Sequence, residues 1–141
     1  MGKFINPFTD YGFKKIFGQE VSKELLIEFL NDLLEGERVI TDLTFLNNEQ
    51  LPIYPGERIA IYDIFCTTDT GEKIIVEMQN RSQVYFKERA LYYLSHAIVR
   101  QGVKGESWKF DIKAVYGVFF INLLIFVWED LYEGKNINIR R

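Results

Sequence analysis

The chain has 141 residues, of which 48% are hydrophobic and 26% are charged, and its formal net charge is −3. This length and composition predict one globular domain, spanning residues 1–141, and they exclude a disordered chain. The slightly negative charge argues against a protein that binds polyanions through its overall charge.

The sequence also argues against a secreted or membrane protein. Its first residues, MGKFINPFTD, lack the apolar run of a signal peptide. The longest nearly uncharged stretch, Ala114 to Trp128, is shorter than the roughly 20 apolar residues that a membrane-spanning helix needs. Because Cys66 is the only cysteine and there is one histidine, neither an intrachain disulfide nor the usual Cys/His zinc site can form. We therefore expect a cytoplasmic protein without a membrane partner, in which any metal site uses oxygen ligands.

Two helices are predicted before the first strand. Thr9 or Asp10 can cap a short helix that ends at Gly18, and a second helix is predicted over residues 22–36. The second helix carries apolar residues at helical spacing: Leu25, Leu26, Phe29, Leu30, Leu33 and Leu34. It also carries a row of acids that includes Glu28. Such a row usually faces solvent, and the alternative is that one of its acids faces a metal ion.

The remaining elements complete a mixed domain. Residues 39–46, VITDLTFL, are predicted to form a strand because of their β-branched content, and residues 47–56 form a polar loop with two prolines. A long helix is predicted over 81–101, ended by a glycine, and a buried strand over 113–123. This order predicts an α/β or α+β domain whose mixed sheet carries helices on its faces.

The central pattern is a hairpin that begins at Arg58, with the sequence RIAIYDIFCTTDTGEKIIVEMQN. The turn residues 69–71, DTG, suit a three-residue loop whose last residue adopts a left-handed conformation, in which glycine fits best. When the residues that flank this turn are paired and the register is continued, Asp63 lies opposite Glu77. Gln79 follows two residues later and therefore shares the face of Glu77.

Two carboxylates on an otherwise apolar hairpin need a physical reason, because burying a charge is costly unless it is paired or binds a metal. Directly opposed side chains on neighbouring strands lie about 4.5–5.5 Å apart, and like charges at that separation repel. Asp63 and Glu77 are therefore well placed to share a divalent cation, and Mg²⁺ prefers such oxygen ligands.

Basic residues concentrate after this hairpin. Residues 79–113 contain seven Lys or Arg and three Asp or Glu, so this segment carries +4 and the remainder of the chain −7. Within the predicted helix, Arg89, Tyr93 and Arg100 fall on one basic and aromatic stripe, which suits phosphates and bases. The alternative, which charge alone favours, is a solvated helix face.

Four motifs add a further signal: DYGFKKIFG at 10–18, YDI at 62–64, GEKIIVEMQNR at 71–81 and FKERALYYLS at 86–95. Together with the order of elements, they resemble the PD-(D/E)XK nuclease superfamily, in particular its Rpn-type branch of recombination-promoting nucleases and transposases. The resemblance covers about residues 4–122. It implies a restriction-endonuclease-like αβββαβ core with a short N-terminal helix, and metal-dependent hydrolysis of DNA phosphodiester bonds in recombination or in a mobile element.

The resemblance assigns roles to residues of the hairpin. Asp63 matches the motif aspartate and Glu77 the second acid, and Gln79 stands where many relatives have lysine. These three are the expected catalytic residues. Tyr62 replaces the proline that usually precedes the aspartate. Gln79 lacks the positive charge that would orient and acidify the attacking water, although it can position the water by a hydrogen bond.

The metal and the DNA are assigned in the same way. The expected cofactor, Mg²⁺ or Mn²⁺, is held by Asp63, Glu77 and the backbone carbonyl of Met78, with Asp10 or Glu28 as an additional acid. The expected nucleic-acid contacts are Arg81, Arg89, Tyr93 and Arg100.

The alternative function is a non-catalytic module that kept the nuclease fold to bind nucleic acid or protein, with its two acids neutralised by Arg or Lys neighbours. The C-terminal sequence LLIFVWEDLYEGKNINIRR departs from the family, whose members typically continue with further helices. This departure leaves open a truncated copy, a frameshifted copy or the nuclease core alone. A short chain would leave an apolar sheet edge exposed and favour a homodimer. Two active sites would suit cutting both strands of a duplex.

Overall fold

A computed structural model describes residues 4–79, 84–105, 107–121, 124–130 and 138–140. Its helices are α1 (Asp10–Phe17), the short 3₁₀ helix η1 (Glu20–Ser22), α2 (Lys23–Leu33) and α3 (Phe86–Val99). Its strands are β1 (Leu43–Phe45), β2 (Glu49–Gln50), β3 (Ala60–Ile61), β4 (Ile64–Thr68), β5 (Lys73–Gln79), β6 (Val115–Ile121), β7 (Leu124–Asp130) and β8 (Asn138–Arg140).

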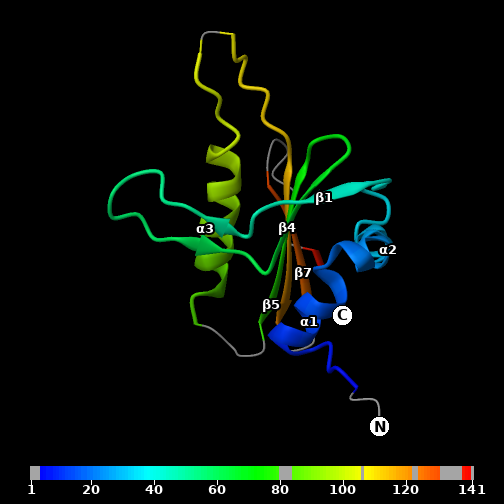
Figure 1. Cartoon of the computed structure of the whole chain (residues 1–141). Helices are drawn as coiled ribbons and strands as arrows, with labels where there is room; N and C mark the ends of the chain where they lie inside the picture. Colours follow the sequence, from blue (N-terminus) through cyan, green and yellow to red (C-terminus); the bar gives the residue numbers. More distant parts are fainter. Residues whose placement is uncertain (1–3, 80–83, 106, 122–123, 131–137, 141) are drawn as a thin grey trace.

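One mixed sheet organises the molecule, with the strand order β1-β4-β5-β6-β7-β8 (Figure 1). Its neighbouring strands are antiparallel except for β5 and β6, which run parallel. Parallel neighbours need a long crossover connection, and α3 provides it. The order α2, β1, β4, β5, α3, β6 is the predicted αβββαβ core, and α1 is the predicted short helix before it. The expected fold class is confirmed.

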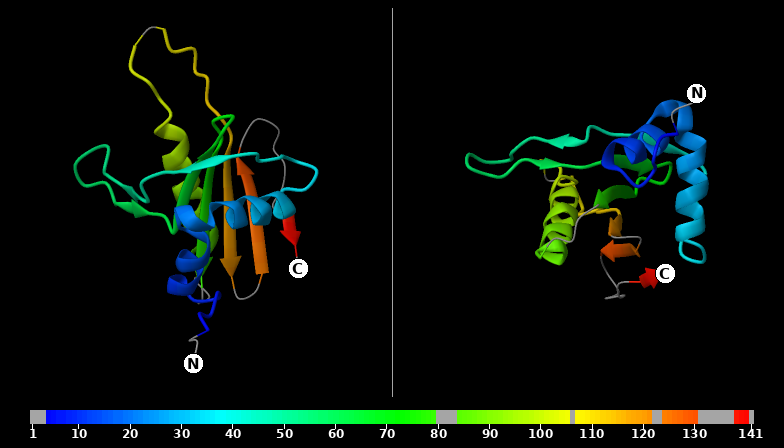
Figure 2. Two further views of the ribbon diagram at one scale, coloured as in Figure 1. Left: turned by 45° about the vertical axis from the view of Figure 1, so that its right-hand side comes forward. Right: turned by 90° about the horizontal axis from the view of Figure 1, so that it is seen from below.

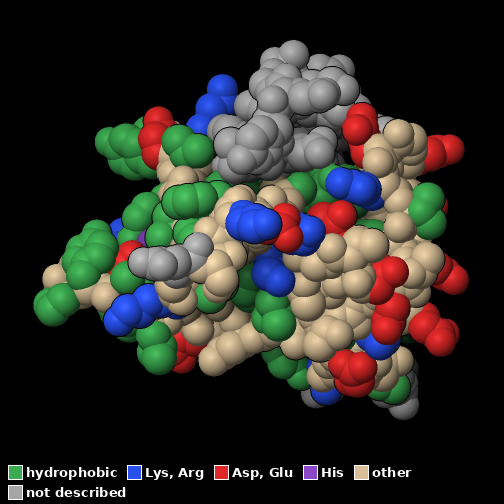
Figure 3. Space-filling view, turned by 90° about the horizontal axis from the view of Figure 1, so that it is seen from above, with side chains coloured by type: hydrophobic (Ala, Val, Ile, Leu, Met, Phe, Trp, Pro, Cys, Tyr) green, Lys and Arg blue, Asp and Glu red, His purple; other side chains and the backbone are tan. Residues whose placement is uncertain are grey.

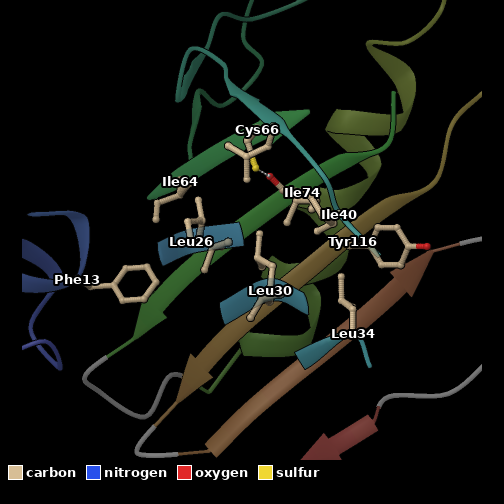
Figure 4. Packing of buried hydrophobic residues seen from close by; sticks show 12 residues of the cluster. Phe13, Leu26, Leu30, Leu34, Ile40, Ile64, Cys66, Ile74 and Tyr116 are labelled. Atoms are coloured by element: carbon tan, nitrogen blue, oxygen red, sulfur yellow. Dashed lines mark hydrogen bonds between the residues drawn. The ribbon is translucent and has the colours of Figure 1, made fainter. Parts of the chain in front are cut away.

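The sheet lies between two helical layers, with α1 and α2 on one face and α3 on the other (Figure 2). Because side chains alternate along a strand, each face receives every second residue. The face toward α1 and α2 is formed by Ile64, Cys66, Ile74, Val76, Tyr116 and Val118. Leu26 and Leu30 of α2 are fully buried against this face (Figure 4). On the other face, Phe65 and Ile75 pack with Leu94 of α3.

The start of α1 is held tightly. Thr9 caps the helix, and its Oγ1 accepts a hydrogen bond from the backbone N–H of Gly12 (2.9 Å). A Cβ atom at Gly12 would lie 1.9 Å from the carbonyl oxygen of Asn6, so this position has no room for a side chain. The orientation of α1, and with it the position of Lys14, is therefore set by close backbone packing.

Residues 47–61 form an arm instead of the predicted loop. The short strands β2 and β3 pair antiparallel, and Figure 1 shows the arm extending past α3. The first strand of the predicted hairpin is consequently interrupted at Tyr62 and Asp63. Asn48 holds this interruption, because its carbonyl accepts from the Tyr62 N–H (3.0 Å) and its Nδ2 donates to the Asp63 carbonyl (3.1 Å).

Acidic and hydrophobic side chains gather on different sides of the surface (Figure 3). Seen from the end of the molecule opposite α1, acidic side chains gather on the side of α2, and hydrophobic side chains gather on the side of the arm (Figure 3). The exposed hydrophobic residues of the arm and its base are Leu51, Ile53, Tyr54, Ile59 and Ile61.

The sheet continues further than the sequence predicted. β7 pairs antiparallel with β6 along its full length, and β8 pairs with β7. No strand was predicted after residue 123, because the apolar run from Val118 to Trp128 contains no Gly or Pro to separate two strands. Across the described part of the chain, no helix has the length and apolarity needed to cross a bilayer.

Candidate active site

The β4–β5 hairpin has the predicted register. Ile64 pairs with Val76, and at the other end the Thr68 N–H donates to the Glu72 carbonyl (2.9 Å). Gly71 closes the turn with φ 94°, a left-handed conformation in which glycine is favoured. The register prediction is confirmed, and Asp63 and Glu77 are the next opposed residues beyond the last backbone pair.

Side-chain hydrogen bonds replace the backbone ladder at these two acids. The Asp63 N–H donates to Glu77 Oε1 (2.9 Å), and the Met78 N–H donates to Asp63 Oδ2 (2.7 Å). Each carboxylate therefore binds the backbone of the opposite strand through one oxygen. The other two oxygens, Asp63 Oδ1 and Glu77 Oε2, remain for other partners.

Both acids are shielded from solvent, which changes their protonation. Glu77 is 2% exposed, and the side chain of Asp63 is 13% exposed. Burial, together with the neighbouring charge of Asp63, raises the pKa of Glu77 to about 8. Burial also raises the pKa of Asp63, against the opposing effects of the Met78 N–H and Lys14. In the absence of an added cation, the pair therefore favours retaining a proton at neutral pH.

Two basic side chains reach the remaining oxygens from the two helical layers. Lys14 of α1 places its Nζ 3.1 Å from Asp63 Oδ1. Arg89 of α3 places its Nη2 3.4 Å from Glu77 Oε2. Arg89 is further held by Tyr93, because its Nη2 lies 3.1 Å from the Tyr93 hydroxyl and its guanidinium carbon 5.0 Å from the ring centroid. The site thus concentrates positive charge around the half-buried Asp63 and the buried Glu77.

A model of the PD-(D/E)XK nuclease family transposases matches residues 7–137, which is most of the chain. The chain belongs to this family. No curated protein and no solved structure matches the sequence significantly. Membership confirms the resemblance drawn from the motifs and associates the chain with nucleases and mobile elements.

The acid pair fits a divalent cation, which nucleases of the PD-(D/E)XK superfamily generally use. Asp63 and Glu77 are adjacent hard oxygen donors. Asp63 Oδ1 and Glu77 Oε2, which do not bind the opposite strand, each already contact a cationic side chain. This donor set suits Mg²⁺ or Mn²⁺. Among the described residues, no group of three or more Asp, Glu, His or Cys side chains could hold a metal. Carbonyl and water oxygens would therefore complete the coordination.

The other hairpin residues predicted for this PD-(D/E)XK site lie beside the acids. Gln79 is buried on β5, two residues after Glu77 and on the same face of the strand. The Met78 N–H points toward Asp63, and the N–H and C=O of a strand residue leave the strand on the same edge. Its carbonyl therefore faces the strand that carries Asp63. The catalytic and metal-binding roles of these residues stay predictions.

Among the other predicted residues that the structure describes, Arg89 contacts Glu77 and Tyr93 contacts Arg89, whereas Asp10, Glu28 and Arg100 have other surroundings. Asp10 contacts Lys14 (3.4 Å), which lies between it and Asp63. Glu28 is exposed on α2, which covers the sheet face opposite α3. Arg100 donates to the Leu51 carbonyl and so holds the arm against α3. Arg81 lies outside the described residues.

Sequence reasoning missed Lys14 as a neighbour of the acid pair. The signal that could have found it was the motif DYGFKKIFG, which contains Lys14 one helical turn after Asp10. That spacing sets the helix face, but only the packing of α1 beside the start of β4 brings the lysine to Asp63. Arg89 was expected to contact phosphate, and the structure places it against Glu77.

Proposed function

We propose that this protein is a divalent-metal-dependent endonuclease that hydrolyses phosphodiester bonds of DNA in recombination or in the movement of a mobile element. The observation that carries the proposal is the contact between Asp63 and Glu77, a half-buried and a buried carboxylate that meet at the open end of a hairpin. Burying two like charges is costly, and binding a cation is a reason to keep them together. Family membership supports the reaction class.

Asp63, Glu77 and the Met78 carbonyl would hold Mg²⁺ or Mn²⁺. Bound there, such an ion polarises a phosphate oxygen and lowers the pKa of water. Gln79, on the same face as Glu77, would position the attacking water by a hydrogen bond. A glutamine carries no charge, so it cannot replace the electrostatic contribution of the lysine found in many relatives.

Lys14 supplies a positive charge beside Asp63, whereas Gln79 carries none. Its Nζ lies 3.1 Å from Asp63 Oδ1. Lys14 belongs to α1, which packs on the sheet face opposite α3. Its side chain is 41% exposed, so a substrate phosphate can approach it. We assign to Lys14 the stabilisation of charge that develops on the phosphate during hydrolysis.

Replacing Lys14 with Met is expected to slow metal-dependent DNA cleavage by about 100-fold, the usual effect of removing one transition-state contact. The rise in melting temperature that Mg²⁺ produces should persist, because the carboxylates are unchanged. Lys14→Arg should retain part of the activity, because it keeps the charge. Lys15, exposed on the same helix, provides the matched control Lys15→Met. Full activity in Lys14→Met would show that Lys14 only neutralises Asp63 in the metal-free protein.

Cleavage of supercoiled plasmid tests the proposed function directly. The purified chain should nick or linearise the plasmid with Mg²⁺ or Mn²⁺ and should stop when EDTA is added. The same ions should raise the melting temperature, as ligands of the native state do. If neither ion supports cleavage and neither changes the melting temperature, the enzyme proposal is wrong.

The non-catalytic alternative has one observation in its favour. Lys14 and Arg89 already place positive charge against Asp63 and Glu77, so the acids can persist without a metal ion. A module of this kind would bind DNA or protein without cutting, and its melting temperature would not respond to Mg²⁺. The plasmid and melting experiments separate the two functions.

A further inference from the structure

A groove beside the acid pair has no role in the reaction described above. It lies where the residues that lead into β3 pass the first half of α3, and its volume is about 660 Å³. The described residues that line it are Arg58, Ile59, Tyr85, Arg89, Tyr92 and Tyr93. Because Arg89 also contacts Glu77 Oε2 (3.4 Å), the groove and the acid pair share this arginine.

The groove presents aromatic rings in defined positions. Tyr85, directly before α3, is 72% exposed, and Tyr92 is 37% exposed. The hydroxyl of Tyr92 donates to the carbonyl of Arg58 (3.2 Å), which holds the ring in the wall. Tyr93 is held edge-on against the buried ring of Tyr62, with 5.2 Å between ring centroids. Two rings are thus fixed by the fold, while Tyr85 offers an exposed face to a ligand.

The charge of the groove favours an anionic ligand. Of the six described lining residues, two are arginines and none is acidic. Arg58 is exposed. The neighbouring acid Glu57 is directed inward, because its side chain is 6% exposed and its Oε1 lies 3.1 Å from His96 Nε2. Aromatic faces combined with basic residues are the means by which proteins bind single-stranded nucleic acid.

We propose that this groove binds an unpaired nucleotide of the DNA strand next to the cleavage site, with its base on Tyr85 and its phosphate at Arg58. This inference rests on the proposed nuclease function, since it assigns the substrate class of the same site. An unpaired base has a free face for a tyrosine, whereas a base within a duplex is covered by its neighbours in the stack. The protein therefore prefers DNA in which a duplex adjoins a single-stranded segment.

The test compares two DNA duplexes in EDTA, one blunt and one with a single-stranded overhang that contains 2-aminopurine. Stacking on an aromatic residue contributes roughly 1–3 kcal/mol per base, which corresponds to about 5- to 150-fold in affinity. By fluorescence anisotropy, the full chain should bind the overhang duplex about 10-fold more tightly than the blunt one, and binding should quench the 2-aminopurine emission.

Tyr85→Leu should remove this preference and the quenching, while its affinity for the blunt duplex stays unchanged. Tyr85→Phe keeps the ring and should retain both. Tyr11→Leu is the matched control, because Tyr11 is 70% exposed on α1, away from the groove. An unchanged melting temperature in each variant confirms that the fold is intact.

Equal affinity of the wild type for both duplexes would overturn the inference, as would an equal loss for both duplexes in Tyr85→Leu. Because binding is measured without metal, it does not depend on cleavage. Overhang preference without metal-dependent cleavage would refute the nuclease proposal and leave the groove assignment standing. Cleavage without overhang preference would refute the groove assignment alone.

Discussion

Asp63→Asn is expected to reduce metal-dependent plasmid cleavage by more than about 100-fold, because it removes a charged metal ligand. Mutation of a residue that only supports a metal ligand already lowers metal affinity or activity by about 10- to 100-fold. The fold should be preserved, since the amide oxygen of the new side chain can still accept the hydrogen bond that Asp63 Oδ2 receives from the Met78 N–H. The Mg²⁺-induced rise in melting temperature should disappear together with the activity. Gel assays of plasmid nicking and thermal melts with and without Mg²⁺ measure both effects.

Asp69→Asn is the matched control for this variant. Asp69 is exposed at the turn of the same hairpin, where it accepts a hydrogen bond from Thr41 Oγ1 (2.8 Å), so its loss leaves the acid pair intact. This variant should retain both cleavage and the response to Mg²⁺. If Asp63→Asn cut plasmid as fast as the wild type, Asp63 would not be a metal ligand.

Glu77→Gln is expected to stabilise the metal-free protein at high pH while abolishing cleavage. Burial raises the pKa of Glu77 to about 8 from its ordinary 4.5, so the folded state binds a proton that the unfolded state releases between these two values. Where the folded state binds more protons, the free energy of unfolding falls as pH rises. The metal-free wild type should therefore lose stability between about pH 4.5 and pH 8 and change little above that range.

The raised pKa of Asp63 acts in the same direction. The lowered pKa values of Glu72 and Asp42 act in the opposite direction. They change the stability only at pH values below the ordinary pKa values of these two groups, near pH 4, and so not between pH 4.5 and pH 8. Glu77→Gln cannot ionise, so its melting temperature should depend less on pH in this range. At pH 8 it should exceed that of the wild type by several degrees, since 1 kcal/mol shifts the melting temperature by roughly 2–4 °C.

With Mg²⁺, the wild type should have a higher melting temperature at pH 8 than Glu77→Gln. The ion needs charged carboxylates, so it should stabilise the wild type increasingly as pH rises toward 8 and should leave Glu77→Gln unchanged. Thermal melts from pH 5 to pH 9, with EDTA or with Mg²⁺, provide the measurement. A Glu77→Gln variant that was less stable than the wild type at high pH in EDTA would refute the assignment of a costly buried carboxyl.

Local sequence patterns were sufficient for the order of the αβββαβ core and for the most specific feature of the site, but not for β2, β3, β7 or β8. The turn residues before Glu72 allow one register, because glycine suits the left-handed conformation that Gly71 adopts (φ 94°). Once the turn is placed, the alternation of side chains along the strands brings Asp63 opposite Glu77 without information from the rest of the chain. The apolar spacing of α2 similarly predicted a helix with one buried face.

Residues that act across elements could not be placed in this way. Lys14 reaches Asp63 because the tight start of α1 sets that helix beside the start of β4. Local spacing along the sequence does not indicate this packing. Arg89 lies on a stripe that suits DNA, yet its contact with Glu77 depends on how α3 crosses the sheet.

The residues of the candidate site are thus placed in two ways, by local rules along the hairpin and by tertiary packing. The acid pair of the hairpin follows from short-range rules, because a tight turn and a two-residue period leave one arrangement. The lysine and arginine around the pair depend on tertiary packing, as do the arm that interrupts the strand at Asp63 and the tyrosine-lined groove. Their positions are decided by which helix face buries the most apolar surface against the sheet, and that balance is a property of the whole core.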